Sequence, residues 1–180
     1  QSTIANRQER TVKLPPGVFP YLLIGHVVIP FFINVVVNVG LGVLTFGGSD
    51  KVPVWSLEKG AVADFLGCCF FLPLITCLIA TPIVRRQAVA GTVSRIPVED
   101  APAWLRFFQG SLFPRALKWG VAGLAVFAGP VSAAWILFAE PTVGTTGFLI
   151  SKSLFAGALG VLVTPLIAIA ELSAARDRTP

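Results

Sequence analysis

Residues 21–46, YLLIGHVVIPFFINVVVNVGLGVLTF, decide the fold of this chain. The stretch is apolar enough to cross a bilayer, which takes a helix of about 20 apolar residues. It also contains three polar side chains, those of His26, Asn34 and Asn38, called here the polar seam. They are separated by multiples of four residues, and Pro30 fills the remaining position. On a helix all four therefore share one face, which predicts a membrane helix with a polar side.

The composition of the whole chain is typical of an integral membrane protein. Of its 180 residues, 54% are hydrophobic and only 13% are charged, whereas a soluble domain is about one quarter charged. Apolar windows that are long enough to span a bilayer occur at about residues 20–46, 61–84, 117–139 and 146–170. Because only short loops and tails remain, we expect residues 1–180 to form a single all-α transmembrane domain, a four-helix bundle.

The longest loop, about residues 85–118, is predicted to contain one further helix. Asp100 can cap a helix over about residues 101–112, with Pro102 tolerated in its first turn. Such a helix collects apolar side chains on one side, those of Trp104, Phe107, Phe108 and Leu112. This pattern is typical of an interfacial helix in the headgroup plane, and a short amphipathic helix that caps the bundle is the alternative.

The basic residues indicate how the chain is oriented. Of the 14 Lys and Arg residues, eleven lie in the two tails and the 85–118 loop, whereas the other two loops contain only Lys51 and Lys59. Because loops rich in Lys and Arg stay on the cytoplasmic side, we expect both termini to be cytoplasmic, in a bacterial inner (plasma) membrane. The net charge of +5 then serves contacts with anionic lipid headgroups. Nucleic acid is not an expected partner, because no soluble basic domain is present.

The start of the sequence carries two expectations. The chain begins with Gln1 and contains no Met, so we expect the natural start to lie elsewhere or to have been trimmed. The first apolar run is too long for a signal peptide and lacks a cleavage site of small residues. We therefore expect it to remain in the protein as a helix.

Motifs of enzymatic chemistry are absent from the sequence. It contains no glycine-rich phosphate loop, no HExxH and no GxSxG. The three cysteines, Cys68, Cys69 and Cys77, lie inside the second apolar window without metal-binding spacing, as small packing residues do. We therefore identify no catalytic residue and no metal ligand, and the sequence implies no particular cofactor.

Polar side chains inside the apolar windows are the candidate functional residues, because such groups are costly in lipid. His26 can carry a proton or bind a ligand beside the helix distortion at Pro30. A neutral His26 bonded to a neighbouring helix is the favoured alternative. For Asn34 and Asn38, a polar path or substrate contact is weighed equally against hydrogen bonds between helices.

Asp64 and Lys152 form a second candidate group, the outer charged cluster. Both lie in the first turns of their helices, and these two helices run in the same direction, so both charges lie at the outer end near Asn38. An ion pair between them avoids two lone buried charges. The pair can gate an ion or a substrate. A contact that fixes helix packing, or a Lys152 that reaches the interface, is the favoured alternative.

Prolines and small residues add two further expectations. Each predicted helix contains one internal proline, namely Pro30, Pro73, Pro130 and Pro165. Such kinks suit a protein that changes shape, although prolines are common in membrane helices. On the third helix, Ala125, Gly129 and Ala133 repeat every four residues, a pattern that lets helices pack closely.

Together these features predict a transporter or channel for a small solute or ion. Since four helices enclose little volume, we expect it to act as a homo-oligomer in which the polar seam lines a path. The first alternative is a non-catalytic accessory or assembly subunit of a larger complex, with another membrane protein on the seam. The second is an enzyme that acts on lipid or quinone at the cytoplasmic face, which is disfavoured because no acid–base pair is found there.

Overall fold

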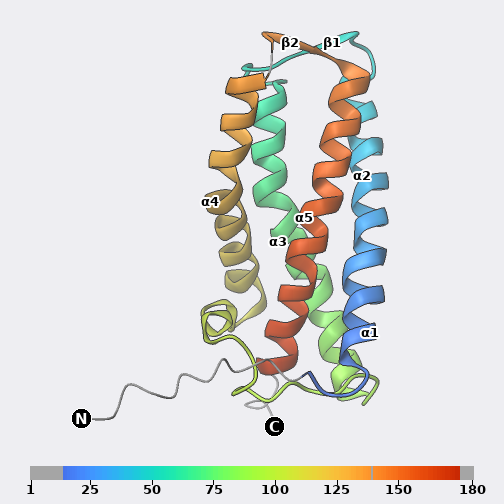
Figure 1. Ribbon diagram of the computed structural model, residues 1–180, viewed down its shortest axis with the longest axis vertical. Helices are drawn as coiled ribbons and strands as arrows, with labels where there is room; N and C mark the ends of the chain where they lie inside the picture. The colour runs from blue at the N-terminus through green and yellow to red at the C-terminus, as the bar shows by residue number, and fades with distance from the viewer. Residues whose placement is uncertain (1–13, 139, 175–180) are drawn as a thin grey trace, which may run out of the picture.

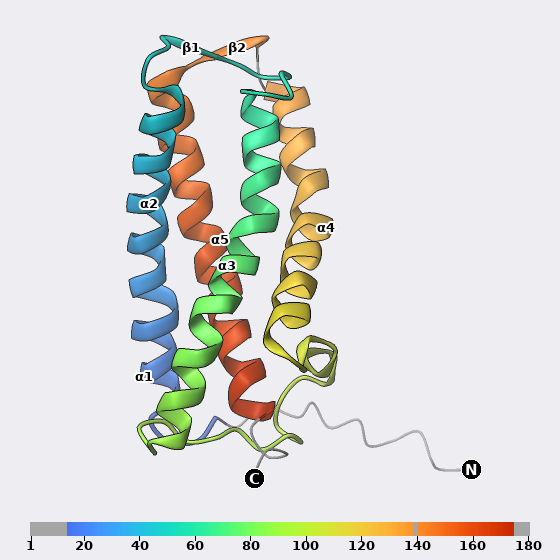
Figure 2. The same ribbon diagram turned by 180° about the vertical axis from the view of Figure 1, so that it is seen from behind.

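The computed structural model describes residues 14–138 and 140–174. This part of the chain contains four helices that are long and apolar enough to cross a membrane (Figure 1). The first and last described residues lie at one end of the bundle, called here the terminal end. Two short strands lie at the opposite end, the strand end (Figures 1 and 2).

The first span runs over Val18–Phe46 and consists of three consecutive elements. They are α1 (Val18–Leu23), the π-helical segment η1 (Ile24–Val28) and α2 (Ile29–Phe46). The other three spans are the single helices α3 (Ala61–Val89), α4 (Leu112–Phe138) and α5 (Thr145–Ala174). At the terminal end the helices extend past the apolar windows: α3 continues to Val89 and α4 begins at Leu112. The backbone hydrogen bonds of a helix do not require apolar side chains, so the helix can continue after the apolar stretch has ended.

The internal prolines lie in helices, as the apolar windows predicted, with one addition. Pro30 opens α2, and Pro130 and Pro165 lie inside α4 and α5. α3 contains two prolines, Pro73 and Pro82. The prediction of one internal proline per helix was wrong for α3: Pro82 already lay within the predicted window 61–84, and because α3 continues to Val89 it is an internal proline as well.

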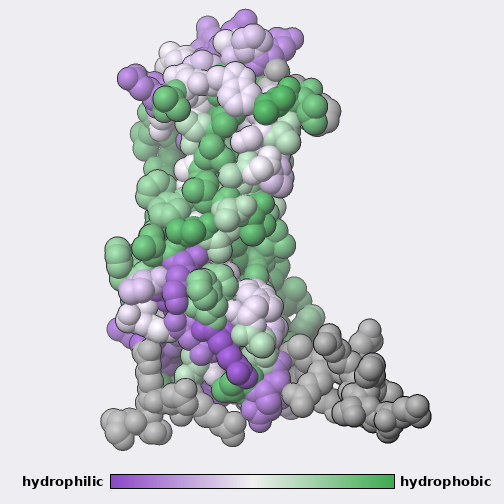
Figure 3. All heavy atoms as spheres, turned by 90° about the vertical axis from the view of Figure 1, so that its left-hand side faces the viewer, coloured by the Kyte–Doolittle hydropathy of each residue, from purple (hydrophilic) through white to green (hydrophobic). Residues whose placement is uncertain are grey.

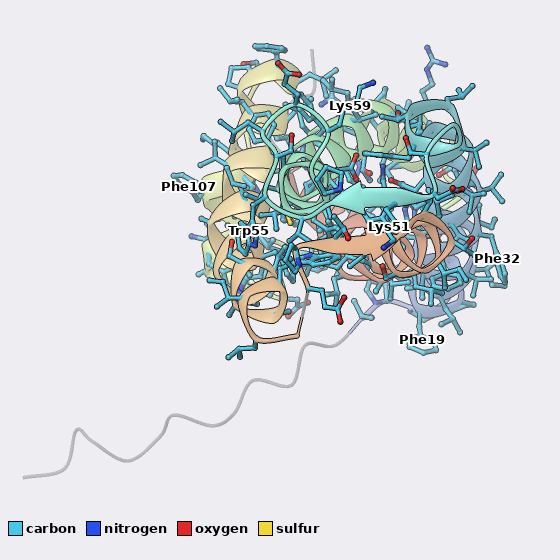
Figure 4. The ribbon with its side chains drawn as sticks, turned by 90° about the horizontal axis from the view of Figure 1, so that it is seen from above. Phe19, Phe32, Lys51, Trp55, Lys59 and Phe107 are labelled. Carbon is cyan, nitrogen blue, oxygen red and sulfur yellow. The ribbon has the colours of Figure 1, made fainter. Side chains whose placement is uncertain are left out.

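Two short strands connect the helices at the strand end. β1 (Lys51–Pro53) pairs antiparallel with β2 (Thr142–Gly144), and Val52 lies opposite Val143. The pair lies across this end of the bundle (Figure 4), and the Val52 side chain is buried beneath it. Strands of three residues leave no readable alternation in a sequence, and these were not predicted.

α5 is the central helix of the bundle. It packs against α2 and against α3, whereas α4 packs mainly against α3. Glycines allow the close approach of α5 to α2: a Cβ at Gly160 would lie 2.3 Å from the amide nitrogen of Asn34, and one at Gly157 would lie 2.8 Å from the Phe31 ring. Small residues at such contacts are the usual means of helix packing in lipid.

α3 changes its neighbour along its length (Figure 2). In the half near the strands it lies against α4, where a Cβ at Gly123 would be 2.4 Å from the Cys69 carbonyl oxygen. In the terminal half it lies beside α1, and the Tyr21 hydroxyl donates to Oε1 of Gln87 at 2.6 Å. Pro73 lies near the middle of α3, where a missing backbone hydrogen bond favours a bend. As a result, α3 leans away from α2 towards the strand end.

The surface between the two ends of the bundle is apolar. Figure 3 shows this on the side of α4, where hydrophobic residues form the middle and hydrophilic residues gather at the ends. Large apolar side chains are exposed on α2 as well, including those of Phe32, Val36 and Leu44. An apolar belt of this kind on four long helices indicates an integral membrane protein.

The helix predicted over about residues 101–112 was wrong in type and in extent. The chain instead forms a short 3₁₀ helix, η2 (Ala103–Phe108). Trp104 and Phe107 are exposed as predicted, but Phe108 is buried and stacks on Trp119 with ring centroids 4.0 Å apart. The helix cannot continue because Gly110 has a φ of +128°, a conformation that turns the chain into α4.

Candidate functional site

A groove of about 400 Å³ lies between α2 and α3 in the half of the bundle near the strands. α2 and α3 form its walls, and α5 contributes Lys152. The bend of α3 away from α2 explains why the space lies in this half. The residues that line it are Asn34, Val37, Asn38 and Leu41 of α2, Asp64, Gly67, Cys68, Phe71, Leu72, Ile75 and Thr76 of α3, and Lys152 of α5.

An ion pair lies in the groove. The Lys152 ammonium donates to Oδ1 of Asp64 at 2.8 Å and lies 2.8 Å from Oδ2 as well. The Lys152 side chain is 6% exposed and that of Asp64 is 23% exposed. The carboxylate is therefore the partner that is accessible from the groove. The ammonium lies deeper, 6.0 Å from the ring centroids of Phe46 and Phe148, at the outer limit of a cation–π contact.

Asn34 and Asn38 bring polar groups to the wall formed by α2. The side-chain nitrogen of Asn34 donates to the Pro30 carbonyl at 2.8 Å, and that of Asn38 donates to the Asn34 carbonyl at 2.9 Å. Both bonds stay within the helix, so they do not join α2 to a neighbour as the alternative of interhelical bonds required. Each bond uses one of the two N–H groups of its amide, so each residue can offer a ligand its amide oxygen as an acceptor and a second N–H as a donor.

Gly67 keeps the groove open beside the ion pair. It lies three residues after Asp64, about one turn further along α3. A Cβ at Gly67 would meet no atom within 4 Å, whereas one at Gly123 or Gly160 would collide with the adjacent helix. Close helix packing therefore does not account for glycine at this position. Its effect is to leave room next to the carboxylate, at a cost of about 1 kcal/mol relative to alanine in a helix.

The structure places His26 outside the groove. The residue is buried in η1, with its ring edge against Tyr21 at a centroid distance of 4.8 Å. Its Nδ1 has no hydrogen-bond partner among the described residues. The π-helical turn precedes Pro30, whose missing N–H interrupts the regular bonding pattern. The polar seam is thus divided: Asn34 and Asn38 line the groove, and His26 does not.

A second charged cluster, which was not predicted from the sequence, lies at the terminal end. This Arg–Glu–Arg cluster consists of Arg85 of α3, Arg115 of α4 and Glu171 of α5. Glu171 accepts a hydrogen bond from Nη1 of Arg115 and one from Nε of Arg85 at 2.7 Å. Arg115 is 1% exposed and also donates to the Ile167 carbonyl at 3.4 Å. The cluster joins three helices.

A signal for this cluster was present in the sequence. Glu171 follows Ile167 by four residues, so it continues the face of α5 that is buried in the bundle. The apolar windows, however, ended at residue 170 and began again at 117. Glu171 was consequently assigned to a tail, and Arg115 to a loop.

The described residues offer no metal site, because no three His, Cys, Asp or Glu side chains among them are grouped to hold an ion. Cys69 and Cys77 are buried in the apolar core. Comparison with protein-family models, with curated proteins and with solved structures gives no match. The chemistry of the groove is therefore the basis for assigning a function, and its carboxylate, ammonium, amide oxygens and apolar walls are suited to binding.

Proposed function

We propose that this protein is a small membrane transporter that binds its substrate in the groove between α2 and α3. The observation that carries the proposal is that the Asp64 carboxylate of the ion pair is accessible from the groove. A pair that only fixes helix packing is best sealed from its surroundings, since a buried charge is stable only with its partners in place. In the Arg–Glu–Arg cluster, Glu171 and Arg115 are buried, and only Arg85 reaches the surface, at the terminal end and outside the groove. Asp64, by contrast, faces an open space beside Gly67.

The two halves of the bundle differ in a way that supports a carrier over a channel. The groove occupies the half near the strands and reaches Thr76, near the middle of α3. In the terminal half, the space between the first span and α3 is filled by a buried cluster that includes Leu22 and Val84, beside the hydrogen bond from Tyr21 to Gln87. A site that is open on one side and closed on the other is what alternating access requires. If the basic terminal end is cytoplasmic, the groove opens towards the outer side.

The test is transport by reconstituted protein, with the groove filled in a variant. Proteoliposomes are offered a mixture of small solutes, and the contents are measured by mass spectrometry. Gly67→Phe places a ring in the groove. Gly40→Phe is the matched control, because a Cβ there also meets no atom within 4 Å and Gly40 does not line the groove. We expect uptake of at least one solute by the wild type and by Gly40→Phe, and about tenfold less by Gly67→Phe.

Two outcomes contradict the proposal. One is uptake by the wild type that equals that of protein-free liposomes for every solute. The other is equal uptake by Gly67→Phe and Gly40→Phe, since a filled groove then makes no difference to the path. Circular dichroism and gel filtration of each variant show whether it has folded.

The accessory-subunit function is a second candidate, and one observation favours it. Ala125, Gly129 and Ala133 are exposed on α4, and a Cβ at Gly129 meets no atom within 4 Å. This small-residue face is therefore not used within the bundle and is free to pack against another helix. Native mass spectrometry after gentle extraction separates the two candidates. Copies of this chain alone support the transporter, whereas stoichiometric binding of a different membrane protein supports the accessory subunit.

A further inference from the structure

The ion pair lies at the depth of lipid headgroups. α5 has 30 residues, which makes it about 45 Å long, compared with about 30 Å for the hydrocarbon core of a bilayer. Its ends therefore project into the headgroup layers. Asp64 is one turn inside α3 and Lys152 is two turns inside α5, both counted from the strand end. The pair thus lies at the boundary between the headgroups and the hydrocarbon of the nearer leaflet.

From the ion pair towards the middle of the bundle, the groove has the length and the apolar lining that an acyl chain requires. It continues along α3 to Thr76, near the middle of that helix, so it spans about one leaflet. Its rim consists of apolar side chains that are about half exposed, those of Val37, Leu41, Phe71 and Ile75. β1 and β2 lie across the strand end (Figure 4), whereas the rim residues are exposed along α2 and α3, on the apolar surface that the bilayer would cover. A molecule can therefore enter sideways from the lipid.

The charges of the pair restrict the headgroup. Asp64 and Lys152 compensate each other, so a ligand that separates them must supply both signs of charge. A headgroup with a single charge would leave one of the two side chains uncompensated, which is strongly unfavourable at a buried site. Both carboxylate oxygens of Asp64 lie 2.8 Å from the Lys152 ammonium, so a ligand that separates the pair has to replace an N–H donor at this carboxylate. The positive group of the ligand should therefore be able to donate a hydrogen bond, which an ammonium with N–H groups does and a quaternary ammonium does not.

We infer that the groove binds a lipid whose zwitterionic headgroup carries a primary ammonium. The ammonium donates to Asp64, the phosphate accepts from Lys152, and one acyl chain lies between α2 and α3. The lipid comes from the leaflet at the strand end. This inference rests on the proposed function, because it names the substrate class of the groove that we propose as the transport site.

The first experiment measures which lipid stays bound. The protein is reconstituted in nanodiscs with equal amounts of phosphatidylethanolamine, phosphatidylcholine and phosphatidylglycerol with identical chains. It is then extracted in mild detergent, and the retained lipids are measured by native mass spectrometry. We expect phosphatidylethanolamine to be enriched about tenfold over each of the others, which is the effect of one hydrogen bond to a charged group. Gly67→Phe should abolish the enrichment, and Gly40→Phe should keep it.

A second variant tests the charges without creating a lone buried one. Asp64→Asn combined with Lys152→Gln removes both charges and keeps similar side-chain shapes. We expect this double variant to retain the three lipids equally. Equal retention by the wild type, a preference for phosphatidylglycerol or phosphatidylcholine, or enrichment that persists in a folded Gly67→Phe protein would each overturn the inference.

A separate readout distinguishes failure of the inference from failure of the proposed function. Phosphatidylethanolamine labelled on its acyl chain is incorporated in proteoliposomes, and its movement between leaflets is followed by chemical quenching of the outer leaflet. Enrichment without movement supports the lipid site and contradicts transport. Uptake of a water-soluble solute without lipid enrichment overturns the lipid site and supports transport of another substrate.

Discussion

At the scale of single residues, the glycines of α3 and α4 have different physical roles and should respond oppositely to the same change. Gly67→Ala should raise the free energy of unfolding by about 0.5–1 kcal/mol, since alanine favours the helix and its Cβ meets no atom within 4 Å. Gly123→Ala should lower it by about 1–3 kcal/mol through overpacking, because its Cβ would lie 2.4 Å from the Cys69 carbonyl. Thermal unfolding in detergent measures both changes. Stabilisation by both substitutions would show that α3 and α4 are less closely packed at Gly123 than in this structure.

A second prediction at this scale concerns the coupling between Asp64 and Lys152 in the groove. Asp64→Asn leaves the buried ammonium of Lys152 without a counter-charge, and Lys152→Gln leaves the carboxylate alone. We expect each single change to destabilise the protein and the double change to cost less than their sum, with a coupling energy of about 0.5–3 kcal/mol. A double-mutant cycle of unfolding free energies gives this energy. Strict additivity would mean that the two charges stabilise the fold independently.

At the scale of elements, the Arg–Glu–Arg cluster should hold α3, α4 and α5 together at the terminal end. Glu171→Gln leaves two guanidinium groups facing each other, and we expect a loss of about 3–5 kcal/mol. Arg85→Gln should cost about 1 kcal/mol or less, because the Arg85 side chain is 42% exposed. Thermal unfolding of each variant tests this order, with the exposed loop residue Glu58→Gln as the control. Equal losses for Glu171→Gln and Glu58→Gln would show that the cluster does not stabilise the bundle.

Some features of these elements are local in the sequence, and others depend on how the helices bend and pack. The four spans follow from hydropathy, because the length of an apolar run is a local property. The proximity of Asp64 and Lys152 follows from the direction of the two helices. The groove does not follow from the sequence, because it depends on where α3 bends away from α2. Both Pro73 and Pro82 were possible positions for this bend. Phe108 was assigned to the lipid side because a regular helix was assumed, and the turn at Gly110 instead sends it inward against Trp119.

At the scale of the whole molecule, the first and last described residues lie at the same end of the bundle, and its basic residues predict the side of the membrane that this end occupies. Arg85, Arg86 and Arg95 lie there, whereas the strand end has Lys51 and Lys59. The excess of basic residues should keep the terminal end in the cytoplasm. A cysteine at Lys59 should therefore react with an impermeant maleimide on intact cells, and one at Thr92 only after permeabilisation. The wild type is the background control, and the reverse pattern would place the groove on the cytoplasmic side.

The central position of α5 has a consequence for how the protein is made. α5 is the last of the four spans to leave the ribosome, yet it packs against both α2 and α3. Until α5 is inserted, Asp64 lacks its ion-pair partner Lys152, and Arg115 lacks its ion-pair partner Glu171. α3 and α4 can pair beforehand, because their glycine contacts involve only each other. Biogenesis should therefore pass through an incomplete bundle with unpaired charges, and this intermediate is the species that a membrane quality-control protease or an insertion chaperone would encounter.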